Sequence, residues 1–152
     1  MKFLNRLATV IVLAATPFAG AAQDAAFSAE NQPLLTEADN LDAFRWVARP
    51  VIVFADSTND PRFIEQINLL DARKDALFER DVVVIADTDP ENPSELRRQL
   101  RPRGFSLVLV GKDGQIELRK PAPWDVRELT RAIDKMPLRM QEIRDENRAG
   151  SG

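Results

Sequence analysis

The sequence contains no cysteine and no histidine among its 152 residues. The absence of cysteine excludes disulfides, a lipid-anchored N-terminal cysteine and a thiol nucleophile of the chain itself. The absence of histidine excludes Ser-His and Cys-His nucleophile pairs, and together the two absences exclude the usual zinc ligand sets. Binding without catalysis, and general acid–base catalysis by carboxylates with or without a metal ion, are among the roles that remain.

The N-terminal residues have the pattern of a secretory signal peptide. Lys2 and Arg6 come before a short uncharged run, and small residues follow up to Ala22. The run is short for a membrane span and polar residues come next, so residues 1–22 are predicted to be a cleaved signal. The alternatives are a buried amphipathic helix and an uncleaved anchor. The sequence therefore predicts a secreted protein, periplasmic if the source is a Gram-negative bacterium.

Removal of residues 1–22 leaves 19 basic and 24 acidic side chains. This excess of negative charge argues against nucleic acid as a general partner, and the chain offers no polybasic patch for a membrane surface. The partner is predicted to be an unknown protein, a peptide or a small polar ligand, and the oligomeric state stays open. No cofactor and no metal ion is predicted.

The hydrophobic pattern predicts one α/β domain over residues 39–145, between a flexible segment at 23–38 and a disordered tail at 146–152. Buried strands are predicted from short apolar runs rich in β-branched residues, and helices from apolar residues at helical spacing. The predicted elements are a short helix ending near Trp46 with Thr36 and Asp39 as its capping box, a strand at 51–55, a helix at 61–79, a strand at 82–86, a short helix opened by Asn92 and Pro93, a strand at 105–110, an edge strand at 115–119 and a helix at 124–135.

This order is βαβαββα, with a short N-terminal helical extension and a C-terminal helical tail. The crossover through the 61–79 helix makes the first two strands parallel, and the Asp-Gly turn makes the last two antiparallel. The element order is that of the thioredoxin fold.

Four segments carry a resemblance to a known family: "RPVIVFADSTNDPRF", "LFERDVVVIADTD", "GFSLVLVGKDGQIELR" and "IDKMPLRMQEIR". In this order they resemble an exported bacterial thioredoxin-like family catalogued as a domain of unknown function. A related peroxiredoxin-like domain occurs in vertebrate extracellular proteins with sushi repeats. The resemblance covers about residues 39–145 and implies a thioredoxin-like fold and export, without a settled activity.

The junction between the first strand and the next helix is where thioredoxins carry their reactive cysteines. Alignment on this junction places Thr58-Asn59-Asp60-Pro61 where Cys-x-x-Cys would be, and Ser106 where the cis-proline would be. Disulfide exchange and peroxide reduction by a resident thiol are therefore excluded. Capping of the helix by Asp60, with Pro61 in its first turn, is a sufficient structural reason for those two residues.

The same edge of the sheet is where open α/β sheets bind ligands, because the carboxyl ends of parallel strands meet there. A ligand-binding rim is predicted from polar residues at the ends of the first two strands and the start of the third, with a neutral peptide or polar ligand favoured over a metal ion or an anion. Its members are Asp56, Ser57, Thr58, Asp60, Asp87, Asp89 and Ser106.

Two further places have both a structural and a functional interpretation. Trp46 is predicted to cover the core, the alternative being a cation–π surface with Arg45 and Arg49. Met136, Met140 and Ile143 form a stripe on a C-terminal helix, which is predicted to pack on its own domain rather than on a partner.

Three functional hypotheses follow. The leading one is an exported, non-catalytic module that binds through the rim or the C-terminal helix. The second is an enzyme, with or without a metal ion, in which Asp56 or Asp87 acts as general base. Such a base needs a pKa raised by burial or by a like-charged neighbour, which the Asp56/Asp87 pair would supply if the two carboxylates are close. The third, implied only by the resemblance, is a peroxiredoxin-like antioxidant role, which without cysteine would depend on methionine oxidation or a borrowed thiol.

Overall fold

The computed structural model of the protein describes residues 34–152. The predicted signal peptide and most of the predicted flexible segment at 23–38 lie outside the described residues. From residue 34 onward the chain forms the 3-10 helix η2 (Asp42–Phe44), β1 (Arg49–Phe54), α1 (Pro61–Asp71), α2 (Lys74–Phe78), β2 (Val82–Asp87), α3 (Glu95–Leu100), β3 (Ser106–Val110), β4 (Ile116–Lys120), α4 (Val126–Asp134) and α5 (Pro137–Ala149).

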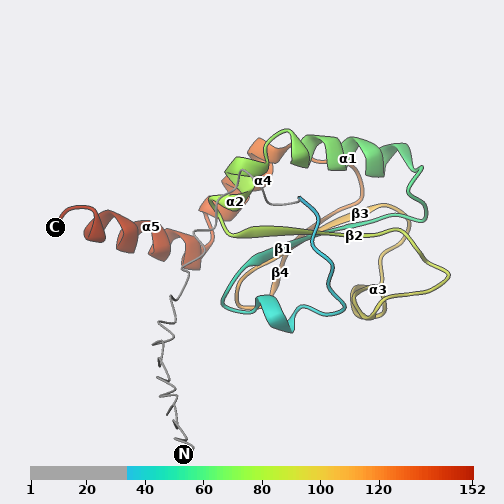
Figure 1. Ribbon diagram of the computed structural model, residues 1–152, viewed down its shortest axis with the longest axis horizontal. Helices are drawn as coiled ribbons and strands as arrows, with labels where there is room; N and C mark the ends of the chain where they lie inside the picture. Colours follow the sequence, from blue (N-terminus) through green and yellow to red (C-terminus); the bar gives the residue numbers. More distant parts are fainter. Residues whose placement is uncertain (1–33) are drawn as a thin grey trace, which may run out of the picture.

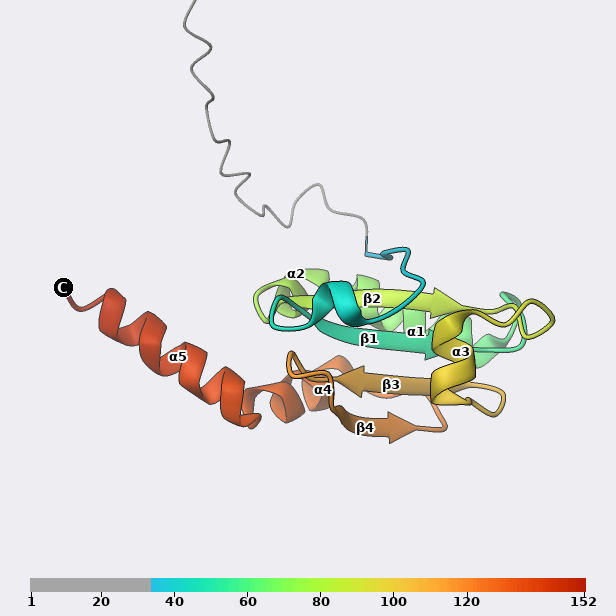
Figure 2. The same ribbon diagram turned by 90° about the horizontal axis from the view of Figure 1, so that it is seen from below.

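The four strands form one mixed sheet in the order β2-β1-β3-β4 (Figure 2). β1 and β2 are parallel, β1 and β3 are antiparallel, and β3 and β4 form the predicted antiparallel hairpin. The register pairs Phe54 with Asp87 on one side and with Ser106 on the other. The ends of β1 and β2 and the start of β3 therefore meet at one edge of the sheet, as the sequence predicts.

Helices cover both faces of the sheet, in a three-layer α/β/α arrangement (Figure 1). α1, α2 and α4 lie on one face, and the apolar cluster beneath them includes Val51, Val53 and Leu129. α3 and η2 lie on the other face, where Ile52 and Phe54 pack against Leu96 and its neighbours. Alternate residues of β1 thus enter opposite cores, which explains why this strand is a continuous apolar run rather than an alternating one.

A buried glutamine connects α1 to the loop before α4. The Gln66 side chain is fully buried, and its Oε1 accepts a hydrogen bond of 2.8 Å from the backbone N–H of Trp124. Its Nε2 donates to the Trp124 carbonyl at 3.2 Å. The oxygen and the nitrogen of the side-chain amide thus each have a hydrogen-bond partner. This buried polar residue therefore connects α1 to the loop before α4 at little desolvation cost.

The segment before β1 differs from the prediction. Instead of a helix capped by Thr36, the Thr36 N–H donates to the Val84 carbonyl, and Leu35 pairs with Val84 as an extra bridge on β2. Pairing with the open edge of β2 holds this segment extended, and only the 3-10 turn η2 remains helical. Trp46 was predicted to cover the core, but it is 65% exposed.

The helices after β1 and β2 also differ in detail. The predicted 61–79 helix is divided into α1 and α2, and Leu77 and Phe78 at the end of α2 are both buried. The cap of α3 is Ser94, whose Oγ accepts from the Arg97 N–H, and not Asn92 as predicted.

The C-terminal helix α5 extends beyond the end of the sheet (Figure 1). It continues to Ala149, so four residues of the tail predicted to be disordered are helical. Of the predicted stripe, Met136 is buried in the core, whereas Met140 is 44% exposed. In the part of the chain that the structure describes, no helix has the length and apolarity needed to cross a bilayer.

Candidate functional site

The centre of the rim is an ion pair between Asp87, the last residue of β2, and Arg97 on α3. Arg97 Nη2 lies 2.8 Å from Asp87 Oδ1 and its Nε lies 2.9 Å from the same oxygen. The other carboxylate oxygen, Oδ2, accepts from the Ser94 hydroxyl. Only 9% of each of the two charged side chains is exposed. Asp87 is therefore a structural anion, whose oxygens are already occupied.

Arg97 also closes the ends of the strands. Its Nη2 donates to the carbonyl oxygens of Ala55, at 2.8 Å, and Asp87, at 2.9 Å. Its guanidinium carbon lies 5.4 Å from the centroid of the Phe54 ring. A planar fork of donors suits this site better than a lysine would, because several acceptors surround it. One arginine thus fills the crevice that the sequence assigned to a ligand.

Sequence reasoning missed Arg97. The one available signal was its position next to Leu96 on the short helix. If Leu96 faces the sheet, the side chain of the next residue lies close to the sheet as well, although it is charged. Because Arg97 Nη1 lies 3.9 Å from Asp56 Oδ1, the guanidinium contacts both carboxylates of the hypothetical catalytic pair. The mutual repulsion that the carboxylate-enzyme hypothesis requires is countered by this positive charge.

Asp60 caps α1, as the sequence predicts. Its Oδ1 accepts from the Arg62 backbone N–H at 2.9 Å, and the Arg62 side chain binds both carboxylate oxygens. The hydrogen bond from the Arg62 side chain lowers the pKa of Asp60 below its ordinary value. Ser57 Oγ accepts from the Asn59 N–H in the same loop. These contacts order the loop between β1 and α1.

Asp89 organises the loop after β2. Its oxygens accept from the backbone N–H groups of Glu91 and Asn92 and from the Asn92 side chain. The hydrogen bonds from Asn92 lower the pKa of Asp89 below its ordinary value. Three of the four acidic residues predicted as one ligand-binding rim are thus divided among a helix cap, an ion pair and a turn.

Four predicted members of the rim are exposed: Asp56, Ser57, Thr58 and Asp89. Within residues 34–152, no cluster of three or more Asp, Glu, His or Cys side chains is placed to hold a metal ion.

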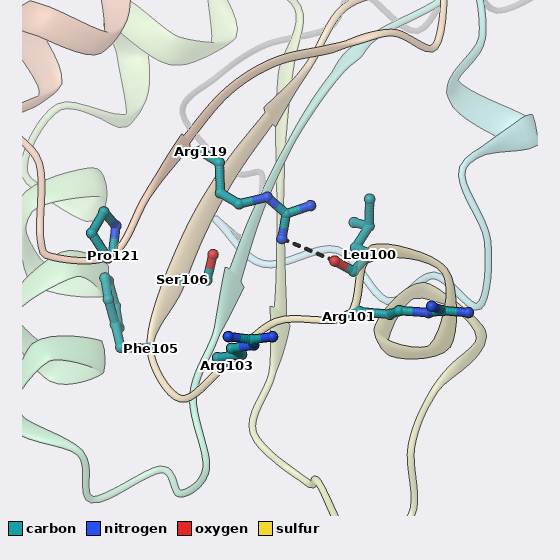
Figure 3. A pocket seen from close by; sticks show the side chains of 7 residues that line it. All are labelled: Leu100, Arg101, Arg103, Phe105, Ser106, Arg119 and Pro121. Atoms are coloured by element: carbon teal, nitrogen blue, oxygen red, sulfur yellow. Dashed lines mark hydrogen bonds between the residues drawn. The ribbon is translucent and has the colours of Figure 1, made fainter.

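Ser106, the last predicted residue, lines a groove beside the Asp87–Arg97 pair. The groove has a volume of about 490 Å³ and lies between the loop that connects α3 to β3 and the end of β4 (Figure 3). Its walls are formed by Leu100, Arg101, Arg103, Phe105, Ser106, Arg119 and Pro121. This volume is in the range of small-molecule sites, about 300–1,000 Å³. We call it the arginine groove.

The backbone of the connecting loop explains how the arginine groove forms. Arg101 ends α3 in the left-handed conformation, with φ 47°, and Gly104 adopts φ 59° just before β3. Together they reverse the chain, which places Arg103 beside Ser106 (Figure 3). On the opposite wall, Arg119 Nη1 donates to the Leu100 carbonyl at 2.9 Å and so holds β4 against the end of α3.

Charge distinguishes the arginine groove from the rest of the rim. Its three arginines have no carboxylate within 4.0 Å among the described residues, and no acidic side chain lines the groove. Ser106 is 5% exposed. The buried side-chain nitrogen and oxygen atoms without a hydrogen-bond partner among the described residues are Arg49 Nε and Arg139 Nε, and the Ser106 hydroxyl is not one of them. The sequence prediction included Ser106 but none of the three arginines of the groove, because the three are spread over two elements.

Comparison with known proteins agrees with this fold. Residues 40–142 match the family model described as "Domain of unknown function (DUF4174)". A 46-residue segment is 44% identical to "Coiled-coil domain-containing protein 80" of Danio rerio and covers 30% of this chain but 5% of that protein. The chain therefore spans only a small fraction of the length of that curated relative.

Among solved structures, the chain is similar to a reduced 2-Cys peroxiredoxin of Plasmodium vivax, with a TM-score of 0.51 and 18% identity over 62% of this chain and 80% of the other. At this identity the likeness concerns the fold alone, and it confirms the predicted thioredoxin-like architecture. The family match extends over most of the described residues and confirms the predicted kinship with a domain of unknown function. The chain belongs to the DUF4174 family.

Proposed function

We propose that this protein is an exported, non-catalytic thioredoxin-like module that binds a ligand in the arginine groove. The observation that carries the proposal is an open, ligand-sized cavity beside the strand ends, lined by three arginines and a serine and by no acidic side chain. The acidic rim residues support it indirectly, because most of them are engaged in internal contacts.

Export is part of the proposal and depends on the sequence of residues 1–22. A basic start, a short apolar run and a small-residue site are the features of a cleaved secretory signal. The partner remains the protein, peptide or small polar ligand that the sequence suggests, now assigned to the arginine groove rather than to the acidic loops.

A catalytic role receives less support from the site. A general base needs a free carboxylate oxygen facing the substrate, and both oxygens of Asp87 are engaged by Ser94 and Arg97. Asp56, the other candidate base, is exposed, and its Oδ1 lies 3.9 Å from the Arg97 guanidinium. The peroxidase chemistry of the similar solved structure depends on thiols, and this chain has none.

The test is a thermal-shift screen of the full chain against peptides and common metabolites. A ligand at 100 times its Kd stabilises the folded state by about 2.7 kcal/mol, so an unknown ligand is detectable. We expect at least one ligand to raise the Tm of the wild type, and its effect to be reduced in the Arg103→Ala/Arg119→Ala double variant.

Arg127→Ala is the matched control, because Arg127 is an exposed arginine on α4, on the opposite face of the sheet from α3. This variant should respond to the ligand as the wild type does. Equal stabilisation of all three proteins would place the binding site elsewhere and contradict the proposal.

A further inference from the structure

The geometry points to a specific ligand class for the arginine groove: an amphiphilic anion, with an apolar body and a carboxylate or phosphate head. This inference rests on the proposed binding function and goes further, since that function by itself leaves the chemistry of the ligand open. The inference depends on the polar residues of the groove, on the charges around it and on its apolar residues.

The polar part of the groove matches an oxyanion. Arg103 and Arg119 stand on either side of Ser106, whose hydroxyl oxygen points into the space between them (Figure 3). An arginine presents a planar fork of N–H donors that fits two oxygens of a carboxylate or phosphate. The Ser106 hydroxyl lines the same groove and supplies a further donor to a ligand oxygen.

The surrounding charges favour an anion over a cation. Arg101 adds a third positive charge to the wall of the groove. The neighbouring carboxylate is that of Asp56, whose Oδ2 lies near Gly104, but its Oδ1 is 3.9 Å from the buried Arg97 guanidinium. The field in the groove is therefore positive, which attracts anions and repels cations.

The remaining wall is apolar. Leu100, Phe105 and Pro121 line the same cavity, and Phe105 and Pro121 lie together at the side away from Arg101 (Figure 3). A purely polar anion such as free phosphate would leave this wall without a partner. Leu100 and Phe105 are only 6% and 1% exposed, so an apolar body would gain the free energy of removing apolar surface from water mainly by covering Pro121, which is exposed.

The experiment is isothermal titration calorimetry of the full chain with three eight-carbon probes below their micelle concentrations: octanoate, octyl phosphate and neutral octanol. We expect at least one anion to bind at least about tenfold more tightly than octanol, as one charge-assisted hydrogen bond would give. Whichever of octanoate and octyl phosphate binds more tightly then identifies the preferred head group as carboxylate or phosphate.

Variants connect this binding to the groove. Arg103→Ala should weaken the binding of the two anions about tenfold and leave the affinity for octanol unchanged. Arg103→Lys, which keeps the charge but not the fork, should weaken them less, and Arg127→Ala should have no effect. Circular dichroism of each variant checks folding, and Arg103→Gln replaces Arg103→Ala if the latter does not fold.

The outcomes separate this inference from the proposed function. Octanol binding as tightly as both anions, with no effect of Arg103→Ala, would overturn the anion inference and leave a neutral-ligand site in place. Absence of binding by all three probes would also overturn it, whereas the proposed function is judged separately by the ligand screen.

Discussion

Replacement of Arg97 by methionine is expected to lower the free energy of unfolding by about 3–5 kcal/mol, the cost of breaking a buried ion pair. Asp87 would then be a largely buried carboxylate without a counter-charge, because 9% of its side chain is exposed. The carbonyl oxygens of Ala55 and Asp87 would also lose a donor. The measurement is equilibrium urea unfolding of the full chain at pH 7, followed by far-UV circular dichroism.

The neighbouring Arg98 supplies the matched control. It lies on the same helix, its one ion pair among residues 34–152 is with Glu95 at the surface, and its side chain is 61% exposed. Arg98→Met should change the free energy of unfolding by no more than about 0.5 kcal/mol. The double variant Asp87→Asn/Arg97→Met should be more stable than Arg97→Met alone, since it removes the uncompensated charge. If Arg97→Met lowered the free energy of unfolding as little as Arg98→Met does, this would contradict a structural role for the Asp87–Arg97 ion pair.

The Arg97 result also bears on function. A large loss of stability would show that the Asp87 carboxylate is held as part of the fold. The arginine groove, which is lined by three arginines and by no acidic side chain, would then be the better candidate for a ligand site.

The second large effect is a pH dependence caused by Glu142 on α5. Burial alone would raise the pKa of Glu142, but hydrogen bonds from Lys112, Arg49 and Arg139 outweigh it and lower the pKa to about 2. Arg49 is fully buried and lies 3.0 Å from Glu142 Oε1, while Lys112 lies 2.8 Å from the same oxygen. Glu142 thus connects α5 to β1 and to the β3–β4 turn.

A folded-state pKa below the unfolded value of 4.5 means that the unfolded chain takes up the proton first. The stabilisation is therefore complete above about pH 4.5 and is lost as the pH falls towards about 2. We expect Glu142→Gln to lower the free energy of unfolding at pH 7 by about 2 kcal/mol, allowing for solvent screening of a partly exposed side chain.

Urea unfolding between pH 2 and pH 7 measures this effect. The difference between wild type and Glu142→Gln should narrow as the pH falls below 4.5, the ordinary pKa of this carboxyl. Glu128→Gln is the control, because Glu128 pairs with Arg131 at the surface of α4 and should contribute little at any pH. A difference for Glu142→Gln that stays constant down to pH 2 would contradict the lowered pKa.

Local patterns in the sequence were sufficient for the main elements of the sheet. The apolar runs at 51–55, 82–86 and 105–110 predicted three strands because residues buried on both faces leave no polar alternation. The Asp113-Gly114 pair predicted the hairpin, and Gly114 has the positive φ that such a turn requires. In each case the cause lies within a few residues of the effect.

The parts that sequence reasoning missed depend on contacts between distant segments. Arg97 meets the Ala55 carbonyl across 42 positions of sequence, and Arg49 meets Glu142 across 93. Thr36 is extended because it pairs with β2, which overrides a local capping signal. The acidic residues of the rim were predicted as a group because all follow strand ends, but their hydrogen-bond partners could be identified only once the helices were placed.

The most direct test of ligand binding in the arginine groove is to locate a bound ligand on the protein. Octyl phosphate is titrated into the ¹⁵N-labelled full chain, and backbone amide shifts are followed by NMR. We expect the largest shifts at residues 100–106 and 119–121, which contain the residues that line the arginine groove. Shifts centred instead on the 56–60 loop, on α1 or on α5, or the absence of any shift, would contradict this prediction.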